Sequence, residues 1–428
     1  MHKDFPSRIL FHPSIRPIHH TFGPLATRAQ LLQAFLLQFQ PWKWHDGKEL
    51  QELKEELARL FPAGQVSLFD TGRGALLALL RALELAEGDE VILQGFTCAV
   101  VPNAIIAAGG KPVYVDIHQK TLALDPALVR AAVTRRTRAI ICQHTFGIPA
   151  DTSALRLICN EKDIALIEDC AHVIPDGENG KIGMHGDAIL LSFGRDKAVS
   201  GVSGGAIVTR HALIAKRLCE MEARALRRSS WHILNLVGYP LRYACAKMMW
   251  PLRLAKAYLH GLRLLRLLPP VLRKQEKAGR AETELFRMPN ACAILTLEQL
   301  RSLTTINAHR RSIAQLYGAV AQQEHWESPK GALLSPALQK FPLFVKNAES
   351  VRQKLKSRQI YLDDGWCGAV VNPRTVNERA VGYCAGSCPN AEDVSQRILT
   401  LPTHPTMTRK QAETLLDVLG KMLHTTGT

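Results

Sequence analysis

The sequence lacks several features that mark other classes of protein. None of its 428 residues belongs to an uninterrupted apolar run of about 18, which argues against a membrane-spanning helix. It has no repeat with a period of about 20–50 residues and no low-complexity tract, which excludes repeat arrays. Its ten cysteines include no CxxC pair, so we expect neither a disulfide framework nor a metal site. The first residues lack the apolar core of a secretory signal, so a cytoplasmic location is expected.

Acidic residues are also missing from one long segment, residues 223–275, which contains eleven Lys or Arg. The whole chain has a formal net charge of +16, but the remaining residues hold 43 basic and 38 acidic side chains. The basic character therefore belongs mainly to this segment, and we do not expect a nucleic-acid partner.

From about residue 50 to residue 210, short apolar runs alternate with helical patterns. Several runs are apolar on both faces, as strands buried in a parallel sheet are. The alternation predicts an α/β architecture, and the chain is too long for one hydrophobic core. Residues 290–323 read as one long helix. Short runs and a helix from about Arg409 follow, which predicts a smaller C-terminal α+β domain. The strand-like runs are EVILQ, PVYVDI, RAIICQH, IALIEDC, AILLSF and GAIVT.

Two of these runs end in residues that can carry chemistry. Glu168 and Asp169 end IALIEDC, so at least one carboxylate is expected in a crevice at the carboxyl edge of the sheet. Lys197 follows AILLSF and precedes a glycine-rich turn. TGRG at residues 71–74 opens a predicted helix, whose N-terminal N–H groups favour a phosphate. Pyridoxal phosphate requires such a phosphate cradle, a lysine for the Schiff base and a carboxylate that keeps the pyridine nitrogen protonated.

Four motifs occur around these residues: GRGAL (72–76), EDCAH (168–172), SFGRDK (192–197) and GVSGGA (201–206). They resemble the motifs of the DegT/DnrJ-type (StrS-like) sugar aminotransferases, which depend on pyridoxal phosphate and have fold type I. Further similar runs lie at 88–117, 144–155 and 398–408, so the resemblance covers residues 45–222 and 284–420. It implies a mostly parallel sheet in a large domain, followed by a smaller C-terminal domain.

The resemblance also implies roles for three residues around the cofactor ring. Lys197 is expected to form the Schiff base and to carry the proton of transamination. Asp169 is expected to pair with the pyridine nitrogen. His172 is expected to donate a hydrogen bond to the phenolate oxygen of the ring, although capping or packing at a helix start remains an alternative.

The phosphate site follows from the same resemblance. Ser192 is expected to donate its hydroxyl to the phosphate, and Gly72 and Arg73 to contribute backbone N–H groups. The Arg73 side chain stands where the family usually has a small residue, and two places for its guanidinium are open, the phosphate and the partner subunit. Gly204 and Gly205 are expected to allow close backbone packing behind the lysine.

Two positions depart from the family pattern. Many members carry an aromatic residue that stacks on the ring where this chain has Cys98, which is expected to pack against the cofactor. Phe96 would share a strand face with Cys98 only if that run is extended. Leu285 replaces an asparagine that reaches the phosphate of the neighbouring subunit. What takes over that contact is open.

Residues 223–283 form a longer connection than the family usually has. PLRLAKAYLHGLRLLRLLPP (251–270) predicts an amphipathic helix that begins at Pro251, and such a helix suits an anionic membrane surface. The alternative is a helical hairpin packed on the partner subunit or over the active site. The basic stripe of the predicted helix consists of Arg253, Lys256, His260, Arg263 and Arg266.

We therefore expect an aminotransferase that moves an amino group from an amino acid, by family resemblance L-glutamate, to a keto-sugar carried on a nucleotide. Rival interpretations are a cofactor-dependent sugar dehydratase, against which Lys197 argues, and a non-catalytic scaffold of polysaccharide synthesis at a membrane. Asp364 and Trp366 are candidates for substrate binding. A homodimer is implied. The expected divisions are an N-terminal arm (1–45), a large cofactor-binding domain (46–222), the basic insertion (223–283) and a helix leading into the small domain (284–428).

Overall fold

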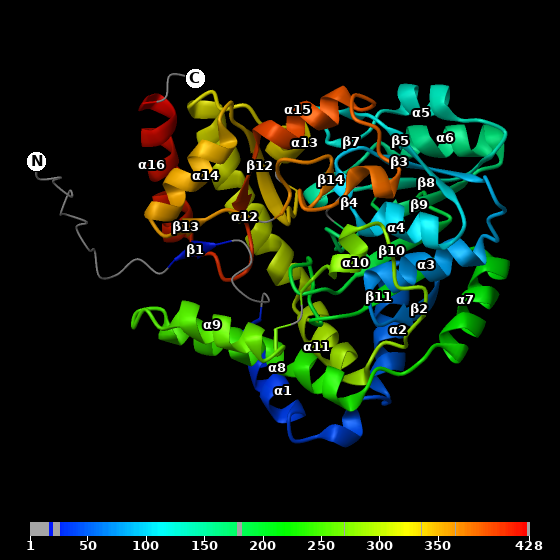
Figure 1. Ribbon diagram of the computed structural model, residues 1–428, viewed down its shortest axis with the longest axis horizontal. Coiled ribbons are helices and arrows are strands. Elements are labelled where there is room, and N and C mark those ends of the chain that lie inside the picture. Colours follow the sequence, from blue (N-terminus) through cyan, green and yellow to red (C-terminus); the bar gives the residue numbers. More distant parts are fainter. Residues whose placement is uncertain are drawn as a thin grey trace, which may run out of the picture.

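A computed structural model describes residues 17–19, 26–177, 182–268, 270–334, 336–363 and 365–425. A seven-stranded sheet lies at the centre of the larger lobe (Figure 1). Its strand order is β2-β11-β10-β9-β8-β3-β5, and β11 is antiparallel to both of its neighbours while the other neighbouring pairs are parallel. The strands are β2 (Gln65–Phe69), β3 (Glu90–Gln94), β5 (Lys111–Val115), β8 (Thr137–Gln143), β9 (Ala165–Asp169), β10 (Ala188–Ser192) and β11 (Gly205–Thr209).

Helices cover both faces of this sheet, so its central strands are buried on both sides. One face packs on α3 (Gly72–Ala82), α4 (Val100–Ala107) and α7 (Ala212–Arg224). The other packs on α1 (Arg28–Leu37), α2 (Glu49–Leu60), α5 (Pro126–Ala132), α6 (Thr152–Lys162) and α11 (Asn290–Leu300). The predicted α/β class is confirmed, and each of the six apolar runs quoted above overlaps a strand of this sheet.

The smaller lobe is built around an antiparallel pair, β12 (Lys340–Phe344) and β15 (Ile398–Pro402). A parallel ladder of β4 (Thr97–Cys98) with β14 (Val371–Asn372) ties this lobe to the loop that follows β3. Its helices are α12 (Leu303–Gln323), α13 (Lys330–Leu333), α14 (Ala348–Ser357), α15 (Pro389–Arg397) and α16 (Arg409–Thr425). The remaining short strands are β1 (Ile18–His19), which pairs with β13 (Ile360–Tyr361), and β6 (Ile117–His118), which pairs with β7 (Ala123–Leu124).

The single long helix expected over residues 290–323 is wrong. The chain forms two helices, α11 and α12, separated by a turn at Arg301 and Ser302. Periodicity alone could not locate this break, because the apolar pattern continues through it while the packing partners change. The first helix packs on α1 and α2 under the sheet, and the second packs on α13 and α16 of the smaller lobe.

The basic insertion contains α8 (Ser230–Met249), α9 (Ala255–Leu264) and α10 (Lys274–Lys277). Helix α9 packs back on α8, and α8 packs on α1, so these three helices lie together along the lower side of Figure 1. The helix expected from Pro251 is shorter than predicted, because Arg253 and Arg266 have φ angles of +59° and +57° and lie outside α9. Within the described residues, no helix is both long enough and apolar enough to cross a bilayer.

Candidate active site

The two carboxylates that end β9 point to opposite sides of the strand, because successive side chains alternate. Glu168 accepts hydrogen bonds from the backbone N–H groups of Gly183 (2.7 Å), His185 (2.8 Å) and Gly186 (2.6 Å). Its other contact is to Nε2 of His144, at 2.9 Å. Burial would raise the pKa of Glu168, but these hydrogen bonds together lower it. Glu168 therefore holds the loop after β9, and Asp169 is the carboxylate left for the crevice.

Asp169 lies at the carboxyl end of β9 and is 4% exposed. Its Oδ1 accepts a hydrogen bond of 2.9 Å from the N–H of Ala171. Burial raises the pKa of the Asp169 carboxyl, while the positive charge of Lys197 acts in the opposite direction. A buried carboxylate at this place is stabilised by a cationic partner, which a protonated ring nitrogen would provide.

His172 lies in the turn after β9 and is buried. The backbone N–H of Phe146 donates to its Nδ1 at 3.1 Å, so the ring proton lies on Nε2. The two rings are stacked, with centroids 5.7 Å apart and planes 18° apart. Burial lowers the pKa of His172 well below its usual value, and the charges of Lys197 and Lys340 lower it further. The imidazole is therefore a neutral hydrogen-bond donor.

The first turn of α3 lies where the sequence predicts a phosphate cradle. Thr71 caps this helix by accepting a hydrogen bond from the N–H of Gly74 at 3.1 Å, while the N–H groups of Gly72 and Arg73 have no acceptor within the helix. A Cβ on Gly72 would lie 2.8 Å from Oγ of Ser192, so the serine hydroxyl adjoins the first helical residue. Any side chain at this position would collide with Ser192, so glycine lets the helix N-terminus and the serine hydroxyl lie next to each other, an arrangement that suits a phosphate group.

Strand register explains why Ser192 and α3 meet. Gly205 pairs with Ser192 on one side and with Phe69 on the other, so β11 joins the end of β10 to the start of the α3 turn. A Cβ on Gly205 would lie 2.5 Å from Cα of Gly72, which leaves no room for a side chain. Gly204 has φ +131°, a conformation that L side chains rarely adopt. These glycines set the spacing of the cradle.

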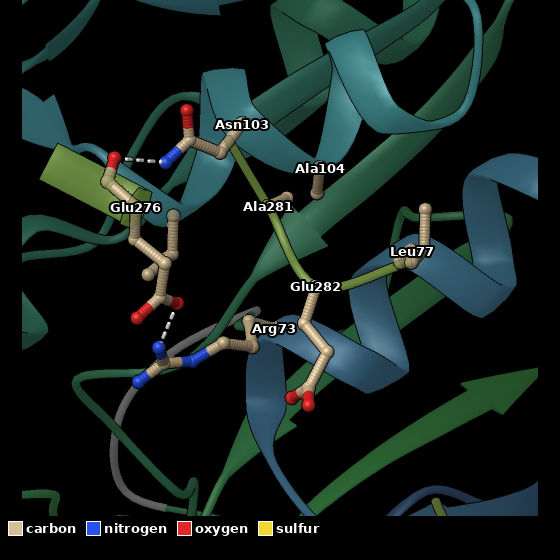
Figure 2. Close-up of a pocket in the computed structure, with 8 residues that line it drawn as sticks. Arg73, Leu77, Asn103, Ala104, Glu276, Ala281 and Glu282 are labelled. Carbon is tan, nitrogen blue, oxygen red and sulfur yellow. Dashed lines mark hydrogen bonds and ion pairs between the residues drawn. The ribbon is translucent and has the colours of Figure 1, made fainter. Parts of the chain in front are cut away.

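Within this chain, the Arg73 guanidinium is held by the basic insertion. It pairs with the carboxylate of Glu276 on α10 and donates to the carbonyl of Val271 at 2.6 Å. Asn103 on α4 donates to the backbone carbonyl of Glu276 at 2.8 Å (Figure 2). Figure 2 shows the contacts of Glu276 with Arg73 and Asn103 beside a pocket between α3, α4 and the end of the insertion. The residues that line this pocket do not include Lys197 or Asp169. The insertion is therefore fastened to the helix that carries the cradle.

Lys197 lies in the loop after β10, partly exposed, on the same edge of the sheet as Ser192. Its charge acts on Asp169, His172 and Cys98, so these three side chains lie within electrostatic reach of Lys197. Burial raises the pKa of the Cys98 thiol, so Cys98 is a neutral side chain, as expected for a packing residue.

Aromatic rings line the crevice behind His172. Phe96 has φ +37°, so the run from Phe96 to Cys98 is not extended and the two residues do not share a strand face. Instead, the ring of Phe96 meets Phe146 and Trp366 edge-on, at 6.1 and 5.5 Å. Trp366 is also edge-on to His172, with ring centroids 4.9 Å apart. Trp366 therefore supports His172, and Asp364, the other candidate for substrate binding, lies outside the described residues.

Sequence patterns missed three residues near this crevice: Phe146, Lys340 and Asn372. Lys340 is buried and its Nζ lies 5.7 Å from the centroid of the Phe146 ring. Asn372 is the strand partner of Cys98. HTFG at 144–147 was a usable signal for Phe146, because it follows a buried strand. The other two come from the smaller lobe, and only the tertiary fold brings them here.

The fold is shared by solved aminotransferase structures. NtdA from Bacillus subtilis with bound cofactor PMP superposes with a TM-score of 0.73, at 21% identity over 96% of this chain and 86% of that one. DesI, solved in the presence of its TDP-sugar product, gives 0.71, at 21% identity over 96% and 93%. Helicobacter pylori PseC, an aminotransferase involved in the biosynthesis of pseudoaminic acid, gives 0.72, at 16% identity over 95% and 100%.

The sequence itself identifies the family. The family model of the DegT/DnrJ/EryC1/StrS aminotransferases matches residues 28–244 and 271–420. The chain therefore belongs to this aminotransferase family, and the family predicted from the four motifs is confirmed. The match is interrupted at residues 245–270, which comprise the end of α8, the whole of α9 and the turns around it. Residues 223–244 and 271–283, which were expected to lie outside the family pattern, are part of the match.

Proposed function

We propose that this enzyme transfers an amino group from an amino acid, L-glutamate, to a keto-sugar carried on a nucleotide, in amino-sugar or cell-surface polysaccharide biosynthesis. The observation that carries the proposal is the meeting of Lys197, Asp169 and His172 beside the cradle of Gly72 and Ser192, in a chain of an aminotransferase family. The neighbours crystallised with PMP and with a TDP-sugar support the cofactor and the class of acceptor.

Pyridoxal phosphate, when bound, supplies an electron sink that stabilises negative charge on the carbon losing its proton. The residues of this chain would hold it and move the proton. The first turn of α3 and the Ser192 hydroxyl bind the phosphate. Asp169 binds the protonated ring nitrogen, and Nε2–H of His172 donates to the phenolate oxygen. The ε-amine of Lys197 would hold the cofactor covalently and would serve as the base and acid that moves the proton at the substrate carbon.

A cofactor-trapping experiment tests this assignment. Purified protein is incubated with pyridoxal phosphate, reduced with borohydride and digested, and the peptide that carries the cofactor is identified by mass spectrometry. We expect the label on Lys197. We also expect L-glutamate to bleach the visible band of the unreduced protein and to release 2-oxoglutarate. A colourless protein without label would overturn the enzyme assignment in favour of a scaffold. If the label is found, the acceptor is sought among nucleotide-linked keto-sugars.

We also propose that the enzyme is a homodimer. The support is the family pattern, in which the segment around Leu285 faces the neighbouring subunit. In this chain Leu285 packs with the α3 side of the sheet, and its carbonyl accepts the N–H of Leu226 at 2.9 Å. Sedimentation equilibrium at micromolar concentration tests the proposal, and a monomer there would contradict it.

We further propose that the enzyme works in the cytoplasm, at the inner face of the cell membrane, through its insertion. Buried Ala255, Leu259 and Leu262 hold α9 against the protein, while Lys256 and Arg263 are exposed on its outer side. Apolar residues are exposed at both ends of this hairpin and on the adjoining α1. They are Leu32, Phe35, Leu36, Phe39, Met248, Leu252, Leu254, Leu264 and Leu265.

We call the exposed residues of α1, α8, α9 and the turns next to them the basal surface. Exposed leucine and phenylalanine beside arginine and lysine fit the interface of an anionic phospholipid membrane, where apolar groups enter the lipid and cations meet the headgroups. Because residues 223–275 contain no acidic side chain, their charge complements such a membrane throughout. The alternative is that the basal surface forms an interface with a second subunit, and vesicle binding by charge-reversal variants distinguishes the two.

A further inference from the structure

A buried asparagine at the crevice has no hydrogen-bond partner for either atom of its side-chain amide. Asn372 is 2% exposed, and among the described residues neither its Nδ2 nor its Oδ1 has a partner. It is the one side chain in the described part of the chain whose amide atoms are both buried and unpaired. Such atoms destabilise a fold, because burial removes their hydrogen bonds to water. The presence of an asparagine at this buried position therefore indicates a ligand that forms hydrogen bonds with its amide.

The ladder between the two lobes places this amide at the catalytic crevice. Asn372 of β14 is the parallel partner of Cys98 of β4, and the N–H of Ala99 donates to the Asn372 carbonyl at 2.9 Å. Side chains of directly paired residues leave a sheet on the same side. The Asn372 amide therefore lies beside the Cys98 thiol, which is within electrostatic reach of Lys197.

The chemistry of an amide narrows the ligand. An asparagine side chain offers two N–H donors and a carbonyl acceptor, so both atoms are satisfied only by groups that accept and donate. A carboxylate, a phosphate or a keto oxygen accepts only and would leave Oδ1 unpaired. In the proposed site, the ring nitrogen, phenolate and phosphate of the cofactor are paired with Asp169, His172 and the first turn of α3. Hydroxyl groups on adjacent carbons of a sugar both donate and accept, and so match the amide.

We propose that Asn372 binds hydroxyl groups of the acceptor sugar and contributes to the choice of sugar. This inference rests on the proposed function and deepens it, because it names one residue of the smaller lobe that recognises the carbohydrate part of the acceptor. Asn372 touches the substrate in this assignment without taking part in the proton transfer.

The test measures binding by the enzyme loaded with cofactor, using commercial probes. TDP-glucose and UDP-N-acetylglucosamine are compared with free TDP and UDP by calorimetry, so that the difference within each pair isolates the contribution of the sugar. We expect the parent to bind at least one nucleotide sugar more tightly than its nucleotide. Asn372→Leu, which is close in size and has no polar atoms, should reduce that difference roughly tenfold, the loss expected for one or two buried hydrogen bonds.

A matched variant and a stability measurement distinguish the alternatives. Asn235→Leu removes another buried amide with an unpaired Oδ1, on α8 of the insertion, and should not change the sugar contribution. Asn372→Leu should unfold at the same temperature as the parent or higher, because it removes unpaired polar atoms. Asn372→Ala serves if the leucine does not fit.

Three results would overturn the proposal. The first is a parent enzyme that binds both nucleotide sugars no more tightly than the nucleotides. The second is an Asn372→Leu enzyme whose sugar contribution is unchanged. The third is a loss of cofactor affinity, or of 2-oxoglutarate release in a single turnover, in that variant. This would mean that the Asn372 amide binds the cofactor or the amino donor and not the sugar. Failure of the proposed function itself would appear separately, as absence of the borohydride label on Lys197.

Discussion

The backbone N–H of Phe146 donates a hydrogen bond of 3.1 Å to Nδ1 of His172. Phe146 has φ +56°, an uncommon conformation for a bulky side chain, and this turn directs both its N–H and its ring at the imidazole. The contact fixes the neutral tautomer whose proton is on Nε2. His172 therefore donates a hydrogen bond in the proposed site and remains uncharged near neutral pH.

This arrangement makes the fold sensitive to acid. In the unfolded chain His172 takes up a proton near its ordinary pKa of about 6.5. The folded protein resists that proton, because burial holds the pKa of His172 well below this value. The stability attached to neutral His172 is thus present above about pH 6.5 and is lost as pH falls, by at most about 1.4 kcal/mol per pH unit. His172→Gln should lose less stability than the parent between about pH 7 and 5 in urea titrations. Parallel stability curves would show that His172 titrates normally in the folded protein.

Lys197→Ala is expected to abolish transamination while the fold remains. The variant lacks the amine that holds the cofactor and carries the proton, and Lys197 is partly exposed, so little packing is lost. Turnover is measured as 2-oxoglutarate released from L-glutamate, and the fold by circular dichroism and thermal unfolding. Substantial turnover in a correctly folded Lys197→Ala enzyme would contradict the catalytic assignment.

Asp169→Asn is expected to bind the cofactor and to lose most activity. The amide has the same shape, but it cannot hold the ring nitrogen in its protonated form, so charge developing on the ring is poorly stabilised. Loss of one such charge-stabilising group costs on the order of 10²–10³-fold in kcat. Cofactor affinity by fluorescence quenching and kcat with L-glutamate are the two measurements. Near-parental kcat would mean that another residue binds the ring nitrogen.

Sequence patterns were sufficient where function depends on residues that lie close together along the chain. The runs that end at Asp169 and Ser192 are neighbouring parallel strands, so their last residues had to meet at one edge. The place of Asn372 could not be predicted in this way, because it depends on a two-residue ladder between lobes. The pairing of Arg73 with Glu276 joins two residues that are more than 200 positions apart in the chain. It depends on how the insertion folds back onto α3, which no local sequence pattern indicates.

The ion pair between Arg73 and Glu276 leads to a stability prediction. The Glu276 side chain is 5% exposed, and its carboxylate also accepts the N–H of Arg273 at 2.7 Å. Glu276→Ala removes both contacts and leaves Arg73 without this partner, which should cost about 1–3 kcal/mol in the free energy of unfolding. Glu161→Ala removes a pair with Arg130 in which both side chains are 51% exposed, and should cost clearly less than Glu276→Ala, because water screens this pair. Equal losses in chemical denaturation would mean that the insertion is not fastened at Glu276.

The last prediction separates membrane binding from subunit packing at the basal surface. Each exposed cation near anionic lipid contributes roughly 1 kcal/mol, and salt screens this attraction. Arg253, Lys256, Arg263 and Arg266 are exposed on α9 and its flanking turns, beside exposed leucines. The parent protein should therefore sediment with phosphatidylserine-containing vesicles at low salt, and weakly with phosphatidylcholine alone.

Reversing these four residues to glutamate should release the protein from the anionic vesicles and leave both oligomeric state and turnover as in the parent. The matched control reverses four exposed lysines on other elements and makes the same change in net charge; they are Lys162, Lys216, Lys330 and Lys410. If general attraction of a basic protein were responsible, both variants would lose binding equally. If the basal surface instead packs on a second subunit, the parent protein would not bind the vesicles. The four reversals would then shift the sedimentation equilibrium toward the monomer. We expect only the α9 reversals to abolish vesicle binding, because the proposed contact needs cations and exposed leucines at the same place.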